Sequence, residues 1–401
     1  MKRSQKIING GFLLALALFF LLGLGRTVFR PKEINSYENT TADRLHRPTV
    51  ETVLDSSFQE SVEEAFSDQV PFSELYKKVY NTANSKLLLK ILSGYLAGKP
   101  ECYVHMRNMN IYAGDYLVYT PSLLQDNEVR QNSLNTKIDG LNKLFSAFPD
   151  LDFYVYYIER DADVNFETGA KNGVREKLFA DLALPAERLG VFQIDGFEEY
   201  RRSFYHTDHH WNCYGSYQGY QEVLQLLNVD EPPLQPVEEL VLPGYRLSGS
   251  KAGTIGASGV FTEEFPAYRF AYPEMKISIT GNEEAADYGN QDAYFAGEPD
   301  SISYGAFYGG DSGEAVFDTG NSEKENILVL GESYDNAILK LLASHFHKTC
   351  SVDLRSYERA VGAPFDFTAY VREHDITKVL LIGSDSYFTM PEFLPAFTPE
   401  G

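Results

Sequence analysis

The most apolar stretch of the sequence lies at its start, where residues 7–25 are almost free of polar side chains. A helix of this length, at about 1.5 Å per residue, is just long enough to cross the hydrocarbon core of a membrane. Lys2, Arg3 and Lys6 precede it as in an export signal, and no A-x-A-like cleavage site follows. The pattern predicts an uncleaved signal-anchor over residues 1–32, with a cleaved signal peptide as the alternative.

This anchor would be a single-pass transmembrane helix in the plasma membrane. Three basic residues lie on each side of the apolar run, so the positive-inside rule does not decide the orientation. The position at the extreme N-terminus favours a chain whose body is exported to the extracytoplasmic side.

Weaker patterns follow the apolar run. Residues 33–60 are polar without periodicity and indicate a stalk. Over residues 66–92 the apolar positions recur at helical spacing, and short strand-like runs follow over 111–119. We therefore expect one large domain over residues 61–401.

Most of this domain alternates between helical and strand-like patterns, as in the apolar run FYVYYI at 153–158. Such alternation favours a mostly parallel sheet covered by helices, an α/β fold. Residues 228–322 break the pattern, because they are rich in Gly, Pro, Tyr and Glu, and we expect a β and loop insertion there. The expected helices are 129–148, 174–182, 214–227, 335–345 and 367–373, and the expected strands are 153–158, 190–194, 327–330, 350–353 and 378–382.

The charge of the chain limits the classes of partner that it can bind. Its formal net charge is −22, and the first 32 residues contain no acid, so the domain itself is more acidic still. Such a surface repels phosphate backbones and argues against nucleic acid as a partner. The three cysteines are too few for a disulfide framework and have no metal-ligand spacing, so we predict no pairing, no metal and no cofactor.

The sequence ILVLGES over 327–333 is the strongest local signal. An apolar strand ends at Gly331, and Ser333 falls where the next helix is expected to begin. This position exposes a hydroxyl at the carboxyl edge of the sheet, where open α/β sheets bind their ligands, and backbone N–H groups there can face an oxyanion. The alternative is that Ser333 only caps the helix.

A second signal is the cluster HTDHHWN over 206–212. A serine nucleophile needs a base, and the base needs a carboxylate that holds its tautomer. Asp208 and His210 are two residues apart, so an extended backbone places both on the same side. A metal site formed by His206, Asp208 and His210 is the main rival, although no second cluster of ligands has convincing spacing.

Two further serines, Ser384 and Ser386, also follow a predicted strand. Pro391 and Pro395 leave little room for a helix after them. We therefore expect these serines to line the site without attacking a substrate.

Taken together, TDHHWN, ILVLGES and DLRSY (353–357) resemble the DHHW proteins, which are similar to the SGNH-like alginate-type O-acetyltransferases. The similarity extends from DQVPFSELY (68–76) to the last predicted strand at Ile382. It implies a three-layer, flavodoxin-like SGNH fold that is circularly permuted, because the Asp/His block precedes the serine.

By this resemblance Ser333 attacks, His210 is the base and Asp208 orients it. The resemblance further implies that the substrate or oxyanion site includes Gly331, Tyr334, Ser384, Asp385 and Trp211. Two departures stand out: Glu332 replaces the usual Asp of G-D-S, and Asp385 stands where many SGNH enzymes use an oxyanion-donating Asn. An ionised carboxylate cannot donate, so Asp385 must be protonated, another group must serve, or activity is impaired.

The function implied is that of an extracytoplasmic serine esterase or O-acetyltransferase acting on cell-surface or exported polysaccharide. A membrane-bound O-acyltransferase is the expected supplier of the acyl group. Tyr304 and Tyr308 would suit stacking on a sugar, or else pack in the core. Two alternatives stay open, a non-catalytic, membrane-tethered glycan-binding or assembly protein and a metal-dependent hydrolase that uses Asp208, His209 and His210.

Overall fold

The chain divides into two compact units, one of residues 1–98 with 252–261 and one of residues 99–251 with 262–401. The structure, a computed structural model, describes residues 3–29, 34–35, 40–41, 48–54, 57–69, 72–73, 75–77, 79–80, 82–84, 86–87, 102–106, 109–280 and 288–391.

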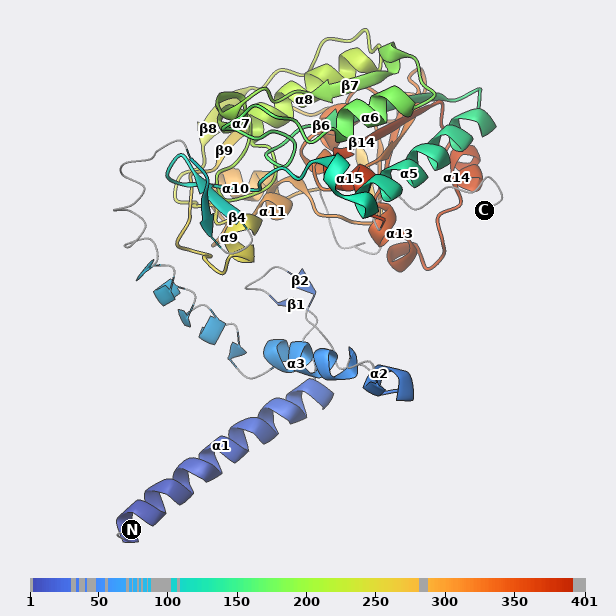
Figure 1. Cartoon of the computed structure of the whole chain (residues 1–401). Helices are drawn as coiled ribbons and strands as arrows, with labels where there is room; N and C mark the ends of the chain where they lie inside the picture. Colours follow the sequence, from blue (N-terminus) through green and yellow to red (C-terminus); the bar gives the residue numbers. More distant parts are fainter. Residues whose placement is uncertain are drawn as a thin grey trace. The chain divides into compact units, whose positions relative to one another are not determined.

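The first unit begins with the helix α1 (Arg3–Phe29), followed by α2 (Val50–Leu54) and α3 (Ser57–Gln69) (Figure 1). The predicted transmembrane segment is not supported. Within the described ranges, none of the helices combines the length and the apolarity needed to cross a membrane. The predicted helix over 66–92 overlaps the end of α3, and residues 75–77, 79–80, 82–84 and 86–87 are helical as well. Part of the range lies outside the described residues.

The second unit is built on a seven-stranded sheet with the order β10-β11-β13-β12-β14-β6-β7. The five strands from β13 to β7 are parallel, and β10 and β11 extend the sheet in antiparallel fashion. The predicted mostly parallel sheet is thus confirmed. The bounds are β6 Asp152–Ile158, β7 Leu189–Phe192, β10 Lys276–Thr280, β11 Glu314–Asp318, β12 Asn326–Leu330, β13 Lys348–Val352 and β14 Lys378–Ser384.

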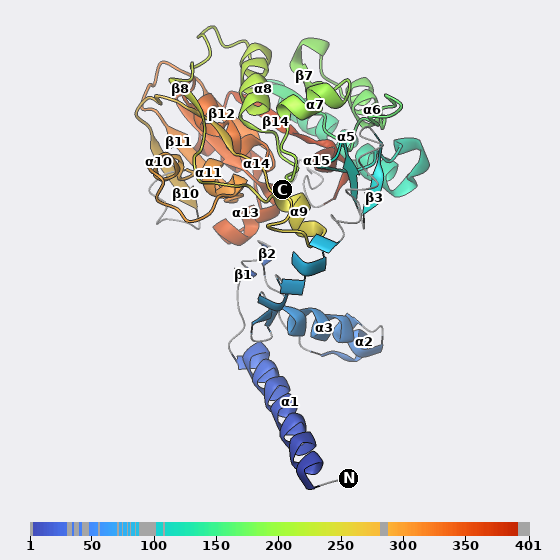
Figure 2. The ribbon, with the colours of Figure 1, turned by 90° about the vertical axis from the view of Figure 1, so that its left-hand side faces the viewer.

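Helices cover both faces of this sheet, as the two views show (Figures 1 and 2). Alternate strand residues face two separate cores: on β6, Tyr154 and Tyr156 belong to one apolar cluster, whereas Val155 and Tyr157 belong to the other. The first cluster includes residues of α8 (Cys213–Leu226) and α12 (Leu339–Ala343). The second includes residues of α5 (Glu128–Ala147), α6 (Val174–Asp181) and α14 (Phe367–Glu373). Burial on both sides explains the continuous apolar runs that predicted these strands.

Two helix predictions need correction. The helix expected over 335–345 is a 3₁₀ turn, η3 (Asp335–Ala337), followed by the short helix α12. The region after β14, where we expected no room for a helix, forms α15 (Asp385–Thr389). Pro391 lies just beyond the end of this helix, so it stops the helix and does not prevent it.

The predicted insertion is less separate than its composition suggests. It forms a hairpin-like pair of strands, β8 (Glu238–Val241) and β9 (Pro266–Arg269), and the short helices α10 (Gln291–Ala296) and α11 (Tyr304–Tyr308). It also supplies β10 and β11 to the main sheet. The helix α13 (Leu354–Val361) was not predicted, and Asp353 caps it by accepting from the N–H of Arg355.

Three neighbouring parallel strands, β12, β14 and β6, end at the same edge of the sheet. The residues that follow them are therefore close in space, with Ser333 after β12, Asp385 after β14 and Arg160 after β6. This edge holds the candidate site.

Candidate active site

The turn that follows β12 carries Ser333. The turn is short, since Asp335 N–H already bonds to the carbonyl of Glu332 at 2.8 Å and opens the 3₁₀ turn η3. The residue before this turn is Tyr334, so Ser333 is not its cap, and the alternative role of Ser333 as a helix cap is wrong. Gly331 is required here, because a Cβ on it would lie 2.1 Å from Asp335 Oδ2.

The TDHHWN segment forms a closed loop before α8. Phe204 and Trp211 pair as an antiparallel bridge, and the Asn212 N–H bonds to the carbonyl of Ser203 at 2.9 Å. The Asn212 side-chain oxygen caps α8 by accepting from the N–H groups of Tyr214 and Gly215. The loop is thus fixed at both of its ends, and Asp208 and His210 lie at defined positions within it.

The structure brings the three predicted residues together in one hydrogen-bonded row. His210 Nε2 lies 2.7 Å from Ser333 Oγ, and His210 Nδ1 lies 2.6 Å from Asp208 Oδ1. Asp208 and His210 are buried, whereas Ser333 is partly exposed. This is the geometry that a base and its orienting carboxylate need to activate a serine hydroxyl.

Two aromatic side chains tie the two segments to each other. Trp211 Nε1 donates to the carbonyl of Tyr334 at 3.0 Å, and Tyr334 Oη donates to the carbonyl of His209 at 2.6 Å. Both rings are fully buried. Trp211 and Tyr334 therefore hold the serine turn against the histidine loop, and their predicted contact with substrate stays a prediction.

Asp208 is held by residues of the insertion that the sequence did not single out. Its Oδ2 accepts the N–H of Ser250 at 2.7 Å. The backbone of Gly249 approaches so closely that a Cβ there would lie 2.4 Å from the Asp208 Cβ. Glu263 accepts from the N–H groups of His206 and Thr207, one step earlier in the loop. The insertion thus fixes the orienting carboxylate.

Lys251, the residue after Ser250, anchors this segment in the protein. Its side chain is completely buried, and its Nζ lies 2.6 Å from Asp161 Oδ2 and 2.7 Å from Tyr200 Oη. Burial lowers the pKa of Lys251, and the adjacent Asp161 carboxylate counteracts this effect. A fully buried ion pair of this kind is destabilised strongly when one partner is removed.

The electrostatics of the loop favour a charged Asp208 beside a neutral His209. Burial alone would raise the pKa of Asp208, but His210, His209 and the Ser250 N–H lower it well below its ordinary value. Burial and the neighbouring His210 lower the pKa of His209 well below its ordinary value. His209 Nδ1 also lies 2.6 Å from Ser250 Oγ.

The Asp385 carboxylate is paired with two arginines and is not available as a hydrogen-bond donor. Its two oxygens lie 2.5 Å from Arg130 Nη2 and 2.7 Å from Arg160 Nη2. Two guanidinium groups stabilise the ionised carboxylate, which accepts hydrogen bonds and donates none. Of the three options for Asp385, the structure therefore disfavours a protonated acid.

The other serines of this edge are bonded elsewhere. Ser384 is buried, and its N–H donates to Glu332 Oε1 at 2.6 Å. Arg160 donates to Ser386 Oγ at 2.9 Å. Within the part of the chain that the structure describes, Ser333 is hydrogen-bonded to a histidine, whereas Ser384 and Ser386 are not.

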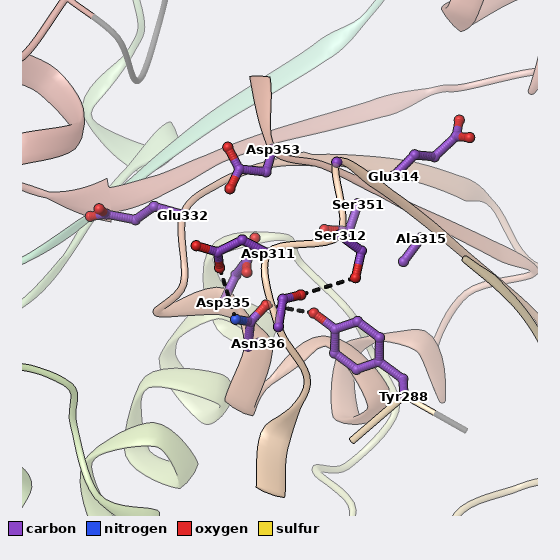
Figure 3. Close-up of a pocket in the computed structure, with 12 residues that line it drawn as sticks. Tyr288, Asp311, Ser312, Glu314, Ala315, Glu332, Asp335, Asn336, Ser351 and Asp353 are labelled. Atoms are coloured by element: carbon purple, nitrogen blue, oxygen red, sulfur yellow. Dashed lines mark hydrogen bonds between the residues drawn. The ribbon is translucent and has the colours of Figure 1, made fainter. Parts of the chain in front are cut away.

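An acidic cavity adjoins the serine turn and contains Glu332 and Asp335, the residues on either side of Ser333 and Tyr334 (Figure 3). Its volume of about 10 Å³ has room for about one water and none for a substrate. Burial, with the charges of Asp311 and Asp353, raises the pKa of Asp335 well above its ordinary value. The cavity supports the turn and does not bind the reactant.

The rival metal site uses the same loop. Among the described residues, Asp208, His209 and His210 form the one group of such ligands whose atoms lie within 4.8 Å of one another. However, the 2.6 Å between Asp208 Oδ1 and His210 Nδ1 is a hydrogen bond. Two ligands of one tetrahedral zinc, each about 2.0–2.1 Å from it, lie roughly 3.3 Å apart. The observed spacing therefore fits a base with its carboxylate better than a metal centre.

Tyr304 does not have the exposure that a sugar-stacking residue needs. It is only 3% exposed, and its ring is stacked on His210 with a centroid distance of 3.8 Å and an interplanar angle of 1°. Tyr308 is also buried. Of the two roles considered for these tyrosines, packing is the one that the structure supports.

With the geometry established, the chain can be compared with known proteins. The chain has a layered α/β fold with a hydrogen-bonded serine, histidine and aspartate at the carboxyl edge of its main sheet. Comparison with protein-family models found no match, and neither did a search of curated proteins.

Solved structures do match. PatB1 from Bacillus cereus aligns with a TM-score of 0.53 at 19% identity, over 73% of this chain and 99% of that one. A second PatB1 structure, with a sulfonyl adduct, gives a TM-score of 0.51 at 21% identity, over 70% and 95% of the two chains. A DHHW family protein from Eubacterium siraeum gives 0.51 at 16% identity, over 72% and 94%. The O-acetyltransferase domain of Pseudomonas putida AlgJ matches at a TM-score of 0.39, too low to support an argument.

The chain thus shares its fold with a DHHW family protein and with PatB1, and the resemblance stated from the motifs is confirmed at the level of the fold. The roles of the individual residues rest on the geometry of this chain alone.

Replacing Lys251 with methionine is expected to lower the free energy of unfolding by about 3 kcal/mol, because the buried Asp161 carboxylate loses its nearest cation and keeps only Arg160, 3.6 Å away. The matched control is Lys177→Met, which removes a partly exposed ion pair with Asp181. This substitution should change the free energy of unfolding by about 0.5 kcal/mol or less. Denaturant unfolding of the full chain measures both. A similar small effect of the two substitutions would contradict the anchoring role of Lys251.

Proposed function

We propose that this protein is a serine esterase or O-acyltransferase with Ser333 as nucleophile, His210 as general base and Asp208 as the carboxylate that orients the base. The observation that carries the proposal is the row of two hydrogen bonds, 2.7 Å from Ser333 Oγ to His210 Nε2 and 2.6 Å from His210 Nδ1 to Asp208 Oδ1. The pairing leaves Nε2 as the acceptor for the serine proton.

The first half-reaction forms an acyl-enzyme. His210 Nε2 takes the proton of Ser333 Oγ while the oxygen attacks the carbonyl carbon of an acyl ester or thioester. The tetrahedral intermediate then collapses, the bond to the leaving group breaks, and His210 returns its proton to that group. Asp208 stays ionised and stabilises the imidazolium in between.

The second half-reaction transfers the acyl group. His210 takes a proton from the acceptor hydroxyl, whose oxygen attacks the acyl carbon. The tetrahedral intermediate then collapses, the bond between the acyl carbon and Ser333 Oγ breaks, and His210 returns the proton to Ser333 Oγ. With water as the acceptor the protein is an esterase, and with a sugar hydroxyl it is an O-acyltransferase.

The oxyanion requires donors other than Asp385, whose carboxylate is paired with Arg130 and Arg160. The N–H groups of Ser333 and Tyr334 are the candidates. In the hydrogen bonds of the described residues, neither of these two N–H groups has an acceptor. Such a donor typically contributes about 3–4 kcal/mol to transition-state stabilisation.

As substrate we propose a cell-surface or exported polysaccharide, which is the acetyl ester in hydrolysis and the hydroxyl acceptor in transfer. The fold shared with a DHHW family protein supports this choice, and so does the acidic chain, which disfavours polyanions. The basic and apolar start of the sequence supports a location outside the cytoplasm. A membrane-bound O-acyltransferase as acyl supplier belongs to the same proposal.

A non-catalytic glycan-binding protein is the second candidate. The pairing of Asp385 with Arg130 and Arg160, at the position where many related enzymes have a donor, is the observation that favours it. Such a protein would keep the fold but would not activate Ser333.

A covalent probe separates the two candidates. We expect phenylmethanesulfonyl fluoride to label the full chain once, because an activated serine attacks the sulfonyl group. Ser333→Ala should abolish the labelling, whereas Ser146→Ala, an exposed serine on α5, should leave it unchanged. Mass spectrometry of the intact proteins measures the adduct. An unlabelled wild type would favour the binding protein.

Metal dependence separates the proposal from the rival hydrolase. We expect hydrolysis of 4-nitrophenyl acetate to be unchanged after dialysis against EDTA, since both nitrogens of His210 have partners within the protein. Loss of turnover that zinc or manganese restores would instead assign Asp208, His209 and His210 to a metal ion.

A further inference from the structure

The imidazole of His210 is in close contact with two other rings. On one face lies Tyr304, with the two planes parallel within 1° and the centroids 3.8 Å apart. The ring of His209 lies at the same centroid distance, tilted by 35°. A third ring, Tyr334, is 5.2 Å away. The hydrogen bonds to Ser333 and Asp208 run along the edge of the imidazole, and the rings restrict its faces.

Tyr304 is itself held in place by its helix and by its hydroxyl group. It belongs to α11, where Ser303 caps the helix by accepting from the N–H of Ala306. The Tyr304 hydroxyl donates to the carbonyl of Tyr334 at 3.3 Å, the same carbonyl that accepts from Trp211. Its ring therefore cannot turn away from His210 without breaking contacts to the serine turn.

The face of an aromatic ring carries negative charge density, so a cation above it is stabilised. His210 is neutral before the serine is deprotonated and becomes a cation when it accepts the proton. An interaction that is stronger in the cationic form lowers the barrier, because it acts on the transition state more than on the ground state.

We propose that Tyr304 is a positioning residue that keeps His210 Nε2 aimed at Ser333 and stabilises the imidazolium through the face of its ring. The proposal rests on the proposed function for its role in the reaction. It assigns to the insertion a residue that acts on the reaction through His210.

The other charged and titratable groups that face His210 are few. Asp208 lies at its Nδ1, and His209 is the neighbouring ring. Tyr334 is at the edge and donates its hydroxyl proton elsewhere. None of these groups is altered by a change at position 304, so a shift in the titration of His210 in such a variant reports on Tyr304.

The test is an NMR titration of the His210 imidazole in the full chain, with the signal assigned through His210→Gln. Tyr304→Leu is expected to lower the pKa of His210 by about 0.5–1 pH unit, since a cation–aromatic contact is worth about 0.5–1 kcal/mol or more. Tyr304→Phe keeps the ring and should leave the titration unchanged. An unchanged titration in the folded Tyr304→Leu protein would overturn the inference.

Two further variants test whether a shift in the titration of His210 is only a structural effect. Tyr308→Leu removes a buried ring of the same helix, 5.0 Å from Tyr304, and should not shift the titration of His210. If Tyr304→Leu does not fold, pentafluorophenylalanine at position 304 replaces it, because this residue has a similar shape and a reversed ring charge. It should lower the pKa of His210, and no change would reject the electrostatic role.

Labelling of Ser333 by phenylmethanesulfonyl fluoride gives the second readout. In Tyr304→Leu the acid limb of the labelling rate should move about 0.5–1 pH unit lower, and the plateau should fall about three- to tenfold. Wild-type protein that is not labelled at Ser333 would count against the proposed function while the titration still decides the role of Tyr304. Labelling without any shift in the variant would keep the function and reject the inference.

Discussion

The hydrogen bond between His210 and Ser333 is the constraint on which the site depends, because it joins two loops 123 residues apart in sequence. One loop follows the central strand β12 and the other precedes α8 on the helical layer. Neither loop could place its functional side chain alone. The sheet edge fixes the serine, the Asn212 cap and the Phe204–Trp211 bridge fix the histidine, and Trp211 joins the two by bonding to the carbonyl of Tyr334.

The insertion supports this contact from another side. Ser250 and Gly249 hold the Asp208 carboxylate, and Glu263 binds the backbone of the same loop. Lys251 ties the segment to Asp161, which lies at the end of β6. Tyr304 covers the face of the imidazole. A region that looks irregular in sequence therefore forms part of the surroundings of His210 and Asp208.

Sequence patterns predicted the layered sheet well, since strands buried on both faces leave continuous apolar runs such as 153–158 and 378–382. They also predicted that Ser333, His210 and Asp208 belong together, because chemistry restricts the partners that a nucleophile needs. The short helix α15 was missed, since Pro391 was taken to forbid a helix that it only ends.

The residues that support the site could not be predicted from sequence patterns. Lys251, Ser250 and Tyr304 have no local motif, and their partners lie 90, 42 and 94 positions away, so only the folded chain brings them together. A lysine in an irregular segment is ordinarily exposed. Nothing in its neighbours predicted that Lys251 would be buried against Asp161.

The central claim is that the Ser333 hydroxyl becomes covalently acylated. The most direct measurement is to react the full chain briefly with 4-nitrophenyl acetate, quench it in acid and locate the acetyl group by peptide mass spectrometry. The account predicts acetyl on Ser333, and a much lower yield when His210 is replaced by glutamine. Acetyl on another residue alone, or an equal yield at Ser333 without the imidazole, would contradict it.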